Sequence, residues 1–443
     1  MSDKRVTIVG AGLAGTEAAW QLAQRGIAVR LIDMKPGKKT PAHQSEHFAE
    51  LVCSNSLRAN RIQNAVGLLK EEMRRLDSLI VRAADETSVP AGGALAVDRE
   101  SFSQRITSIL REHPLVEIIE EEVKAIPASV FAGDKTMIVA TGPLTSTALS
   151  DSISNIVGEG LYFFDAAAPI VTRESLDDTK VFSASRYGKG GDDYINAPMN
   201  REEYFAFLHE LVSAETVQLH DFENARVFEG CMPVEVMAAR GEMTLAFGPL
   251  KPMGLTDPAT GKRPFAVVQL RQDNAEATLY NLVGFQTHLT FPEQRRVFRM
   301  IPGLENAEFA RYGVMHRNTF IHSPGKLNAH FQSIAHPSLY FAGQITGVEG
   351  YVESAASGLM AGMAAAAQAK NQAMADFSTR TAHGALARHV SAYMGGDFQP
   401  MNISFGLIDS LDERIKNKQE RYTAIAERAL LEIDQIATRE TIR

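Results

Sequence analysis

The sequence predicts an α/β protein in which a parallel sheet with flanking helices is interrupted by an inserted α+β domain built on an antiparallel sheet. Three observations support this fold class. A strand, a glycine turn, a helix and a second strand follow one another within residues 6–33. Two later strands, at 135–139 and 338–341, also run into turns of small residues. Between them, from about residue 161, short alternating runs punctuated by Gly and Pro replace the β–α rhythm, which is typical of antiparallel strands.

The opening unit carries the pattern of a dinucleotide-binding fold. Residues 6–9 are a short apolar run with β-branched side chains, which indicates a buried strand. Glycines follow in the order G-x-G-x-x-G, at Gly10, Gly12 and Gly15. The first glycine permits a tight turn, the second lets a pyrophosphate approach the backbone, and the third lets the helix pack on the strand. The second strand ends at Asp33, an acceptor for ribose hydroxyls, so the unit predicts a Rossmann-like domain.

Two further stretches favour FAD over NAD as the dinucleotide. The strand at 135–139 runs into Ala-Thr-Gly at 140–142, an element of flavoproteins with this architecture. The strand at 338–341 runs into Ala-Gly-Gln, where many FAD enzymes have Asp in place of the uncharged Gln344. The predicted cofactor-binding residues are Gly10, Ala11, Gly12, Leu13, Ala14, Gly15, Asp33, Thr141, Gly142, Gly343, Gln344 and Ile345.

The length of the chain predicts more than one domain, since 443 residues are many for a single core. We expect a first part of an FAD-binding domain at 1–160 and an inserted substrate and folate domain at 161–335. Residues 336–443 are then the second part of the FAD-binding domain and C-terminal helices. Helices are expected at 66–79, 99–111 (with Asp98 as cap), 201–213, 291–300, 355–373 and 409–438. Strands of the inserted domain are expected at 162–165, 227–231, 244–248, 265–270 and 278–285.

Composition and charge narrow the class of protein. The formal net charge of −8 argues against non-specific binding of nucleic acid, although a local basic patch remains compatible with it. No apolar run approaches the length of a membrane span, and the chain begins directly with a predicted strand. We therefore expect no membrane segment, no signal peptide and a cytoplasmic location. Two cysteines are too few for a disulfide framework, and no metal-ligand spacing is present, so no metal site is predicted.

The two cysteines are the candidate catalytic residues. Cys53 lies in LVCSNS and Cys231 in FEGCMP, each where a regular element gives way to small, polar or proline residues. A cysteine is more often an inert small hydrophobe than a nucleophile. These two, however, are the only cysteines of the chain, and turn residues flank both. Polar clusters at 269–274 and 316–319 are equally compatible with ligand binding and with structural hydrogen bonding.

Taken together, the motifs resemble one enzyme family nearly from end to end. They include VGAGLAGTEAAW, FAELVCSNSLR, VPAGGALAVDRE, MIVATGPLTS, FEGCMPVEVMAARG, VVQLRQDN, YNLVGFQTHL and YFAGQITGVEGYVESAASGLMAG. The chain is similar to the folate- and FAD-dependent tRNA (uracil-5-)-methyltransferases of the MnmG/TrmFO flavoprotein family. MnmG chains carry a substantial additional C-terminal part, for which 443 residues leave no room.

The resemblance implies a reaction, its cofactors and its partners. It implies transfer of the methylene carbon of 5,10-methylenetetrahydrofolate, by way of reduced flavin, to C5 of the T-loop uridine of tRNA. NADPH or NADH would supply the reducing equivalents. Cys231 would be the nucleophile that adds to C6 of uracil, and Cys53, beside the flavin, the general base at C5. The alternatives are an rRNA uridine methyltransferase, an MnmG-like enzyme, a small-molecule flavin oxidoreductase and a non-catalytic flavin-binding partner of RNA. The sequence does not fix the oligomeric state.

Overall fold

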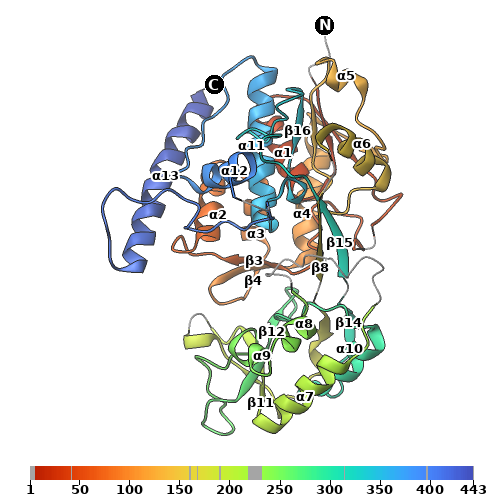
Figure 1. Ribbon diagram of the computed structural model, residues 1–443, viewed down its shortest axis with the longest axis vertical. Helices are drawn as coiled ribbons and strands as arrows, with labels where there is room; N and C mark the ends of the chain where they lie inside the picture. Colours follow the sequence, from red (N-terminus) through yellow and green to blue (C-terminus); the bar gives the residue numbers. More distant parts are fainter. Residues whose placement is uncertain are drawn as a thin grey trace.

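The computed structural model describes residues 5–40, 42–158, 161–166, 168–188, 191–217, 232–313, 315–395 and 398–442, with only the backbone described at 161–166, 315–319 and 441–442. Figure 1 shows two lobes, with the N-terminal and C-terminal thirds of the chain in the upper lobe and the middle third in the lower one. Each lobe has its own apolar core. The first core draws on residues 6–157 and 321–436, and the second on residues 168–307.

A parallel five-stranded sheet forms the centre of the first lobe. Its strands lie in the order β16 (Leu339–Phe341), β7 (Met137–Val139), β1 (Val6–Val9), β2 (Val29–Asp33) and β6 (Val116–Glu120). Every neighbouring pair is parallel, so the carboxyl ends of all the strands lie at one edge. The predicted fold class is therefore confirmed, and the glycine turn lies at this edge, directly after β1.

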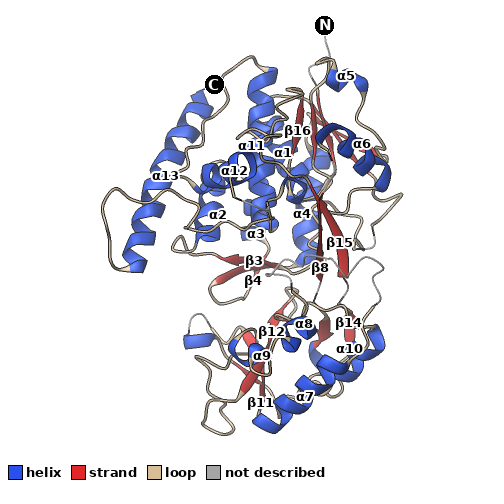
Figure 2. Ribbon diagram, in the orientation of Figure 1, coloured by secondary structure: helices blue, strands red, loops and turns tan. Residues whose placement is uncertain are grey.

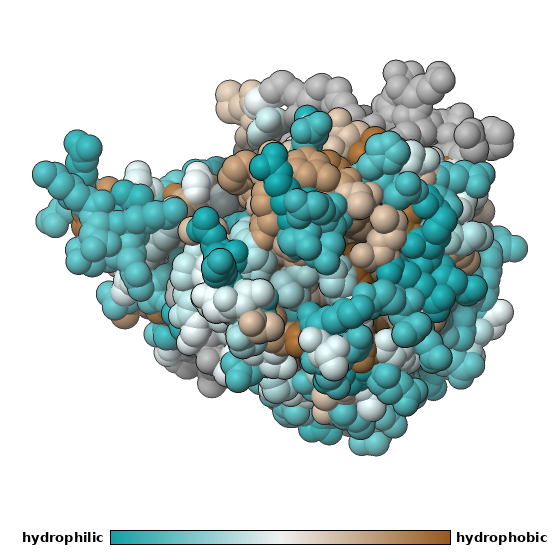
Figure 3. Space-filling view, turned by 90° about the horizontal axis from the view of Figure 1, so that it is seen from below, coloured by the Kyte–Doolittle hydropathy of each residue, from teal (hydrophilic) through white to brown (hydrophobic). Residues whose placement is uncertain are grey.

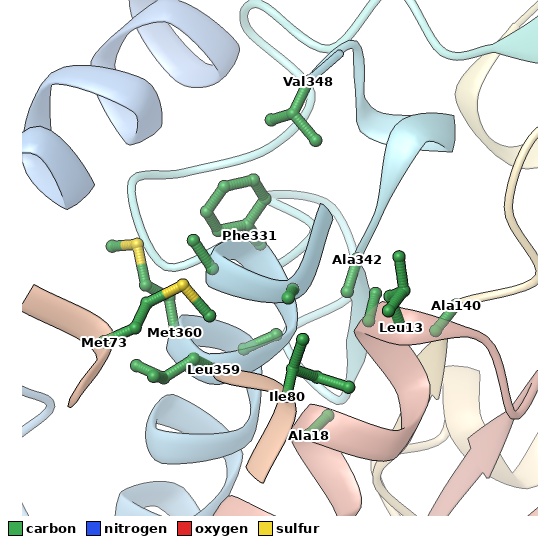
Figure 4. Close-up of a cluster of buried hydrophobic side chains, with 14 of the residues drawn as sticks. Leu13, Ala18, Met73, Ile80, Ala140, Phe331, Ala342, Val348, Leu359 and Met360 are labelled. Atoms are coloured by element: carbon green, nitrogen blue, oxygen red, sulfur yellow. The ribbon is translucent and has the colours of Figure 1, made fainter. Parts of the chain in front are cut away.

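Helices and a small sheet complete the first lobe. The helices are α1 (Leu13–Gln24), α2 (Ala65–Arg75), α3 (Leu79–Glu86), α4 (Arg99–Glu112), α5 (Ala128–Phe131), α6 (Thr147–Val157), α11 (Tyr351–Ala369), α12 (Ala382–Ala392) and α13 (Lys418–Ile442). The small antiparallel sheet has the order β3 (Ser56–Ala59), β5 (Ala94–Val97), β4 (Ser88–Val89). Figure 4 shows Leu13 and Ala18 of α1 among Met73, Ile80 and Leu359, in one buried cluster that joins helices distant in sequence.

The second lobe is built on a six-stranded antiparallel sheet. Its strand order is β10 (Phe182–Ser183), β11 (Tyr194–Met199), β12 (Ala266–Gln272), β13 (Leu279–Leu282), β9 (Ile170–Thr172) and β14 (Phe309–Arg311). Its helices are α7 (Arg201–Ser213), α8 (Val234–Ala239), α9 (Thr244–Phe247) and α10 (Phe291–Phe298). A two-stranded ribbon of β8 (Leu161–Ala166) and β15 (Met315–Phe320) lies between the lobes (Figures 1 and 2).

Several expected elements differ in the structure. The expected strand at 244–248 is wrong: residues 244–247 form the short helix α9, in which Phe247 is 78 % exposed. The helix expected over 66–79 is interrupted, because Asp77 has a φ of +54° and Ser78 caps α3. The helix expected from residue 409 begins only at Lys418. Asp409 instead accepts a hydrogen bond from Arg388, which holds this segment on α12. The helix expected at 355–373 spans Tyr351–Ala369, and the strand expected at 227–231 lies outside the described residues.

The predicted domain boundaries, after residues 160 and 335, stay a prediction, which the division of the two apolar cores supports. Within the described ranges, the helices are too short or too polar to cross a bilayer. The face at the free end of the second lobe is mainly hydrophilic, with apolar side chains gathered in smaller areas (Figure 3).

Candidate functional site

A deep cleft opens at the carboxyl edge of the parallel sheet. It contains about 1140 Å³ of empty space, a volume that includes its open mouth. Its walls come from the glycine turn, the ends of β2 and β7, the loop after β2 and the start of α11. Of the predicted cofactor-binding residues, the cleft is lined by Gly10, Ala11, Gly12, Leu13, Ala14, Asp33, Thr141, Gly142, Gly343 and Gln344.

The three glycines of the turn have distinct structural roles. Gly10 has a φ of +100°, and a Cβ there would lie 2.5 Å from the carbonyl oxygen of Ala140. A Cβ at Gly15 would lie 1.8 Å from the carbonyl oxygen of Gly10, so Gly15 allows α1 to pack on the turn and does not itself line the cleft. A Cβ at Gly12, in contrast, would meet nothing within 4 Å. Gly12 caps α1 without a side chain, which leaves the helix N-terminus open to an anion.

Asp33 is fixed at the end of β2 by two backbone groups. Its Oδ2 accepts a hydrogen bond from the backbone N–H of Ala11 at 2.6 Å, and its Oδ1 accepts from that of Lys35 at 2.9 Å. The carboxylate therefore shapes the glycine turn and keeps lone pairs directed to the cleft, where a ribose hydroxyl could donate.

The second and third turns meet the first across the cleft. Thr141 and Thr145 share a hydrogen bond of 2.6 Å between their hydroxyl oxygens. Gly343 has a φ of +84°, and Gln344 donates from Nε2 to Glu349 Oε2 at 2.5 Å. Ile345 does not line the cleft: its side chain is buried in the first core.

Sequence reasoning missed several residues that line the cleft, among them Lys35, His43, Glu50 and Tyr351. Burial lowers the pKa of Lys35, and burial together with the nearby Lys35 lowers the pKa of His43. Glu50 Oε2 is buried without a hydrogen-bond partner among the described residues, and lies 3.9 Å from Lys35 Nζ. In the sequence Lys35, His43 and Glu50 belong to a polar stretch that is also typical of a solvated loop, so only the structure distinguishes them. Tyr351 is the first residue of α11.

The cleft fits a flavin dinucleotide on several independent observations. An open glycine at a helix N-terminus suits a pyrophosphate, and a fixed carboxylate at the end of β2 suits a ribose. Glu50 Oε2, which accepts no hydrogen bond from the described residues, offers an acceptor for a further hydroxyl.

The loop that carries Cys53 borders the cleft. Val52 lines the cleft, and Cys53 is half-buried. The hydroxyl oxygen of Tyr351, at the start of α11, accepts hydrogen bonds from the backbone N–H groups of Cys53 and Ser54 at 2.7 and 3.1 Å. Burial, and secondly the proximity of Cys53, raise the pKa of Tyr351 well above its ordinary value, so this hydroxyl stays protonated.

Three arginines from separate elements bind the same loop. Arg99 of α4 donates to the carbonyl oxygen of Leu51, and Arg311 of β14 donates to that of Val52 at 2.6 Å. Arg271 of β12 donates to Ser54 Oγ at 2.6 Å and to Asn55 Oδ1 at 3.1 Å. The acceptors thus belong to Leu51, Val52, Ser54 and Asn55, on both sides of Cys53. The second lobe thus contributes two of the three guanidinium groups that hold a loop of the first lobe.

The second candidate cysteine, Cys231, lies outside the described residues, as do the side chains of 316–319. The described chain resumes at Met232, and α8 begins at Val234, whose backbone N–H donates to the carbonyl oxygen of Gln286 at 2.7 Å. The structure therefore places Cys53 directly after Val52, which lines the cleft, and the pairing of the two thiols stays a prediction.

Comparison with known proteins identifies close relatives and a shared fold. The profile of the family described as "Glucose inhibited division protein A" matches residues 5–373. The methylenetetrahydrofolate–tRNA-(uracil-5-)-methyltransferase TrmFO of Desulforamulus reducens is 62% identical over 431 residues, which cover 97% of each chain. The enzyme of the same name from Enterococcus faecalis is 60% identical over 428 residues, 96% of this chain and 97% of the other.

Among solved structures, GidA of Aquifex aeolicus matches with a TM-score of 0.73 at 16% identity. The match covers 98% of this chain and 73% of that one, and it supports the fold alone.

Proposed function

We infer that this chain, which belongs to the glucose inhibited division protein A family and within it to the TrmFO enzymes, is a methylenetetrahydrofolate–tRNA-(uracil-5-)-methyltransferase. Identity near 60% over nearly the full length of several TrmFO chains carries this conclusion. The product is 5-methyluridine in tRNA, with methylenetetrahydrofolate as the carbon donor and FAD as the bound cofactor.

The first lobe would hold FAD in the cleft described above. Gly12 and the N-terminus of α1 would face the pyrophosphate, and Asp33 would accept from the ribose. When bound, the flavin supplies the redox chemistry of the transfer, with NADPH or NADH as the source of electrons. The protein would bind and orient the reactants.

The two cysteines would act on the uracil ring of the substrate. Uracil C5 is a poor nucleophile, and addition of a thiolate to C6 makes C5 reactive. In this assignment Cys231 forms the S–C6 bond, and C5 takes up the one-carbon unit as the bond between that carbon and its donor nitrogen breaks. Two electrons that come from NADPH or NADH through the flavin would bring this carbon from the methylene to the methyl level. Cys53 accepts the proton that leaves C5, after which the C5=C6 bond re-forms and the Cys231 thiolate departs. The position of Cys53 beside the cleft, next to Val52 and Tyr351, supports its share of this assignment.

A direct assay tests the function. FAD-loaded protein is incubated with methylenetetrahydrofolate, NADPH or NADH, and tRNA that lacks the modification, and the digested nucleosides are analysed for 5-methyluridine. We expect product at one uridine of the tRNA T-loop and none when the folate is omitted. Product on rRNA fragments in place of tRNA would favour the rRNA alternative. Rapid NAD(P)H oxidation that needs no RNA and persists after both thiols are removed would contradict the methyltransferase assignment. We further propose that the enzyme acts in the cytoplasm, where its tRNA substrate is found.

A further inference from the structure

We propose that Arg99, Arg271 and Arg311 are positioning residues for Cys53, which hold its loop between the two lobes and stabilise its thiolate. The inference rests on the proposed function, in which Cys53 accepts a proton from the uracil ring. A cysteine can accept a proton only as a thiolate, and an ordinary thiol with a pKa near 8.5 is mostly protonated at neutral pH. A base at this position therefore needs surroundings that favour the negative charge.

The geometry fixes the loop at four residues, two on each side of Cys53. The carbonyl oxygens of Leu51 and Val52 accept from Arg99 and Arg311, and the side chains of Ser54 and Asn55 accept from Arg271. The backbone N–H of Cys53 itself donates a hydrogen bond to the hydroxyl oxygen of Tyr351. Hydrogen bonds therefore fix Cys53 and the residues on both sides of it. Loop 51–55 thus has little freedom to move Cys53 away from the cleft.

The three guanidinium groups also set the electric field at the thiol. Burial lowers the pKa of Arg271, and burial together with Arg99 lowers that of Arg311. Burial likewise opposes the charge of Arg99, but its ion pair with Asp273 leaves the pKa of Arg99 raised. The negative charge of a Cys53 thiolate would favour the protonated form of all three arginines, and this coupling is reciprocal: each guanidinium favours the thiolate.

Few negative charges oppose this field. Asp273, which is 3 % exposed, pairs with Arg99 at 2.9 Å, and Glu50 acts on Arg311 from the cleft side. Within the described part of the chain, neither Arg271 nor Arg311 has a carboxylate within ion-pair distance. Tyr351 on α11, Tyr194 on β11 and His43 in the loop after β2 also face the cluster. Burial raises the pKa of both tyrosines and, with Lys35, lowers that of His43, so each shift favours the neutral form. Positive charge therefore predominates around Cys53.

The test measures the reactivity of Cys53 in the full-length, FAD-loaded protein. The rate of alkylation by iodoacetamide is followed from pH 5.5 to 9.5 (roughly the range over which a perturbed thiol titrates), with mass spectrometry of the peptide that contains Cys53 to separate it from Cys231. We expect a wild-type inflection clearly below that of a free cysteine. Arg311→Met should move the inflection upward by about 1 pH unit, whereas Arg311→Lys, which keeps the charge, should leave it near wild type.

Asp273→Asn should shift the alkylation inflection in the direction opposite to Arg311→Met. This second variant keeps the proposal testable even if Arg311→Met does not fold. It removes a negative charge with little change in shape, so the inflection should move downward. The exposed Arg263, which precedes β12, gives the matched control Arg263→Met, which should not shift the inflection. Absorbance of bound FAD verifies that each variant is folded.

An unperturbed wild-type inflection, or identical inflections for wild type, Arg311→Met and Asp273→Asn, would overturn the proposal. Because this readout is thiol reactivity and not methyl transfer, it distinguishes failure of the proposal from failure of the proposed function. If 5-methyluridine forms but the inflections of the variants equal that of the wild type, only the proposal about the arginines fails. If the inflections shift as expected but no 5-methyluridine forms, only the proposed function fails.

Discussion

Gly12 allows the cofactor assignment to be tested without disturbing the protein itself. Its φ of −75° suits any residue, and a Cβ there meets nothing within 4 Å, so Gly12→Val should fold normally. The added side chain would instead project where a pyrophosphate approaches the N-terminus of α1. We expect the purified variant to lose most of its FAD while its thermal unfolding in the absence of FAD matches that of the wild type. Full flavin content, measured by absorbance, would contradict the placement of the cofactor.

A substitution at Cys231 can test catalysis separately from cofactor binding. In the proposed reaction its thiol forms a bond with uracil and none with the flavin. Cys231→Ala should therefore reduce 5-methyluridine formation below detection while FAD remains bound. Nucleoside analysis and flavin absorbance on one preparation check both halves of the prediction. Loss of colour together with activity would show that the residue acts through the cofactor site.

Lys70 predicts a pH dependence of stability. It is fully buried, and its Nζ donates to the carbonyl oxygens of Leu57 and Ala59 at 2.6 and 2.7 Å. Burial, followed by Arg58 and Arg74, lowers the pKa of Lys70 to about 7. Above this pH the unfolded chain, with an ordinary lysine, binds more protons than the folded one. The free energy of unfolding contributed by this group therefore rises with pH, by up to about 1.4 kcal/mol per unit.

This dependence can be measured against Lys70→Met. From pH 7 to pH 9 the difference in the free energy of unfolding between wild type and variant should shift in favour of the wild type; below pH 7 it should be constant. The exposed Lys416 provides the control substitution Lys416→Met. A difference that is flat from pH 6 to pH 9 would show that the amine stays charged in the folded state.

The residues of the site divide into those that a linear pattern reveals and those that it does not. Gly10, Gly12 and Asp33 act through backbone geometry and fixed spacing, which a sequence displays directly. Arg311 and Val52 are 259 positions apart, and their hydrogen bond depends on how the two lobes meet. No local signal distinguishes Arg311 from a surface arginine. The three arginines that hold the loop of Cys53 could therefore not be predicted from the sequence.

At the scale of elements, the close contact of α1 with α11 links the core to the cleft. A Cβ at Gly358 would lie 2.1 Å from the carbonyl oxygen of Ala14, a residue that lines the cleft. Gly358→Ala should lower the free energy of unfolding by about 2 kcal/mol, although alanine alone favours a helix, because the helices must separate. It should also weaken FAD retention. Urea unfolding and flavin content check both effects.

Gly93→Ala is the control for this substitution, since a Cβ at Gly93 meets nothing within 4 Å. Its effect on stability should be within about 0.5 kcal/mol. Equal stability of the two variants would mean that α11 can move away from α1 at no cost in free energy. It would contradict the role of Gly358 in the close contact of the two helices.

The elements that the sequence predicted well have strong local signals. Helix α4 begins at Arg99, where Asp98 accepts a hydrogen bond from the backbone N–H of Ser101 as a cap. Helix α7 has the predicted bounds and a complete capping box at Asn200. Residues 244–247 lack such a signal: alternation suggested a strand, but the segment is held by its own turns beside Gly241 and Gly248. The apolar period of the sequence also continues across Asp77. It therefore gives no sign that Asp77 has a left-handed backbone conformation, which ends the helix.

At the scale of the whole molecule, the two cores are coupled through loop 51–55. Asn55 is fully buried, and its Nδ2 donates to the carbonyl oxygens of Val97 in the first lobe and Gln272 in the second, both at 2.9 Å. Its Oδ1 accepts from Arg271. A ligand that stabilises the first lobe therefore stabilises contacts that the second lobe also uses. FAD at a hundred times its dissociation constant adds about 2.7 kcal/mol to the state that binds it.

We expect this coupling to appear in hydrogen exchange. In the wild type, added FAD should slow amide exchange in β12 of the second lobe as well as in β1 of the first. Asn55→Ala leaves buried partners unsatisfied, which costs roughly 1–3 kcal/mol, and should confine the protection by FAD to the first lobe. Asn60→Ala, at an exposed position of the same lobe, should preserve the wild-type response. Because Asn55 contacts the cleft only through its loop, a response of β12 that survives Asn55→Ala would show that the lobes communicate by another route, through the β8–β15 ribbon.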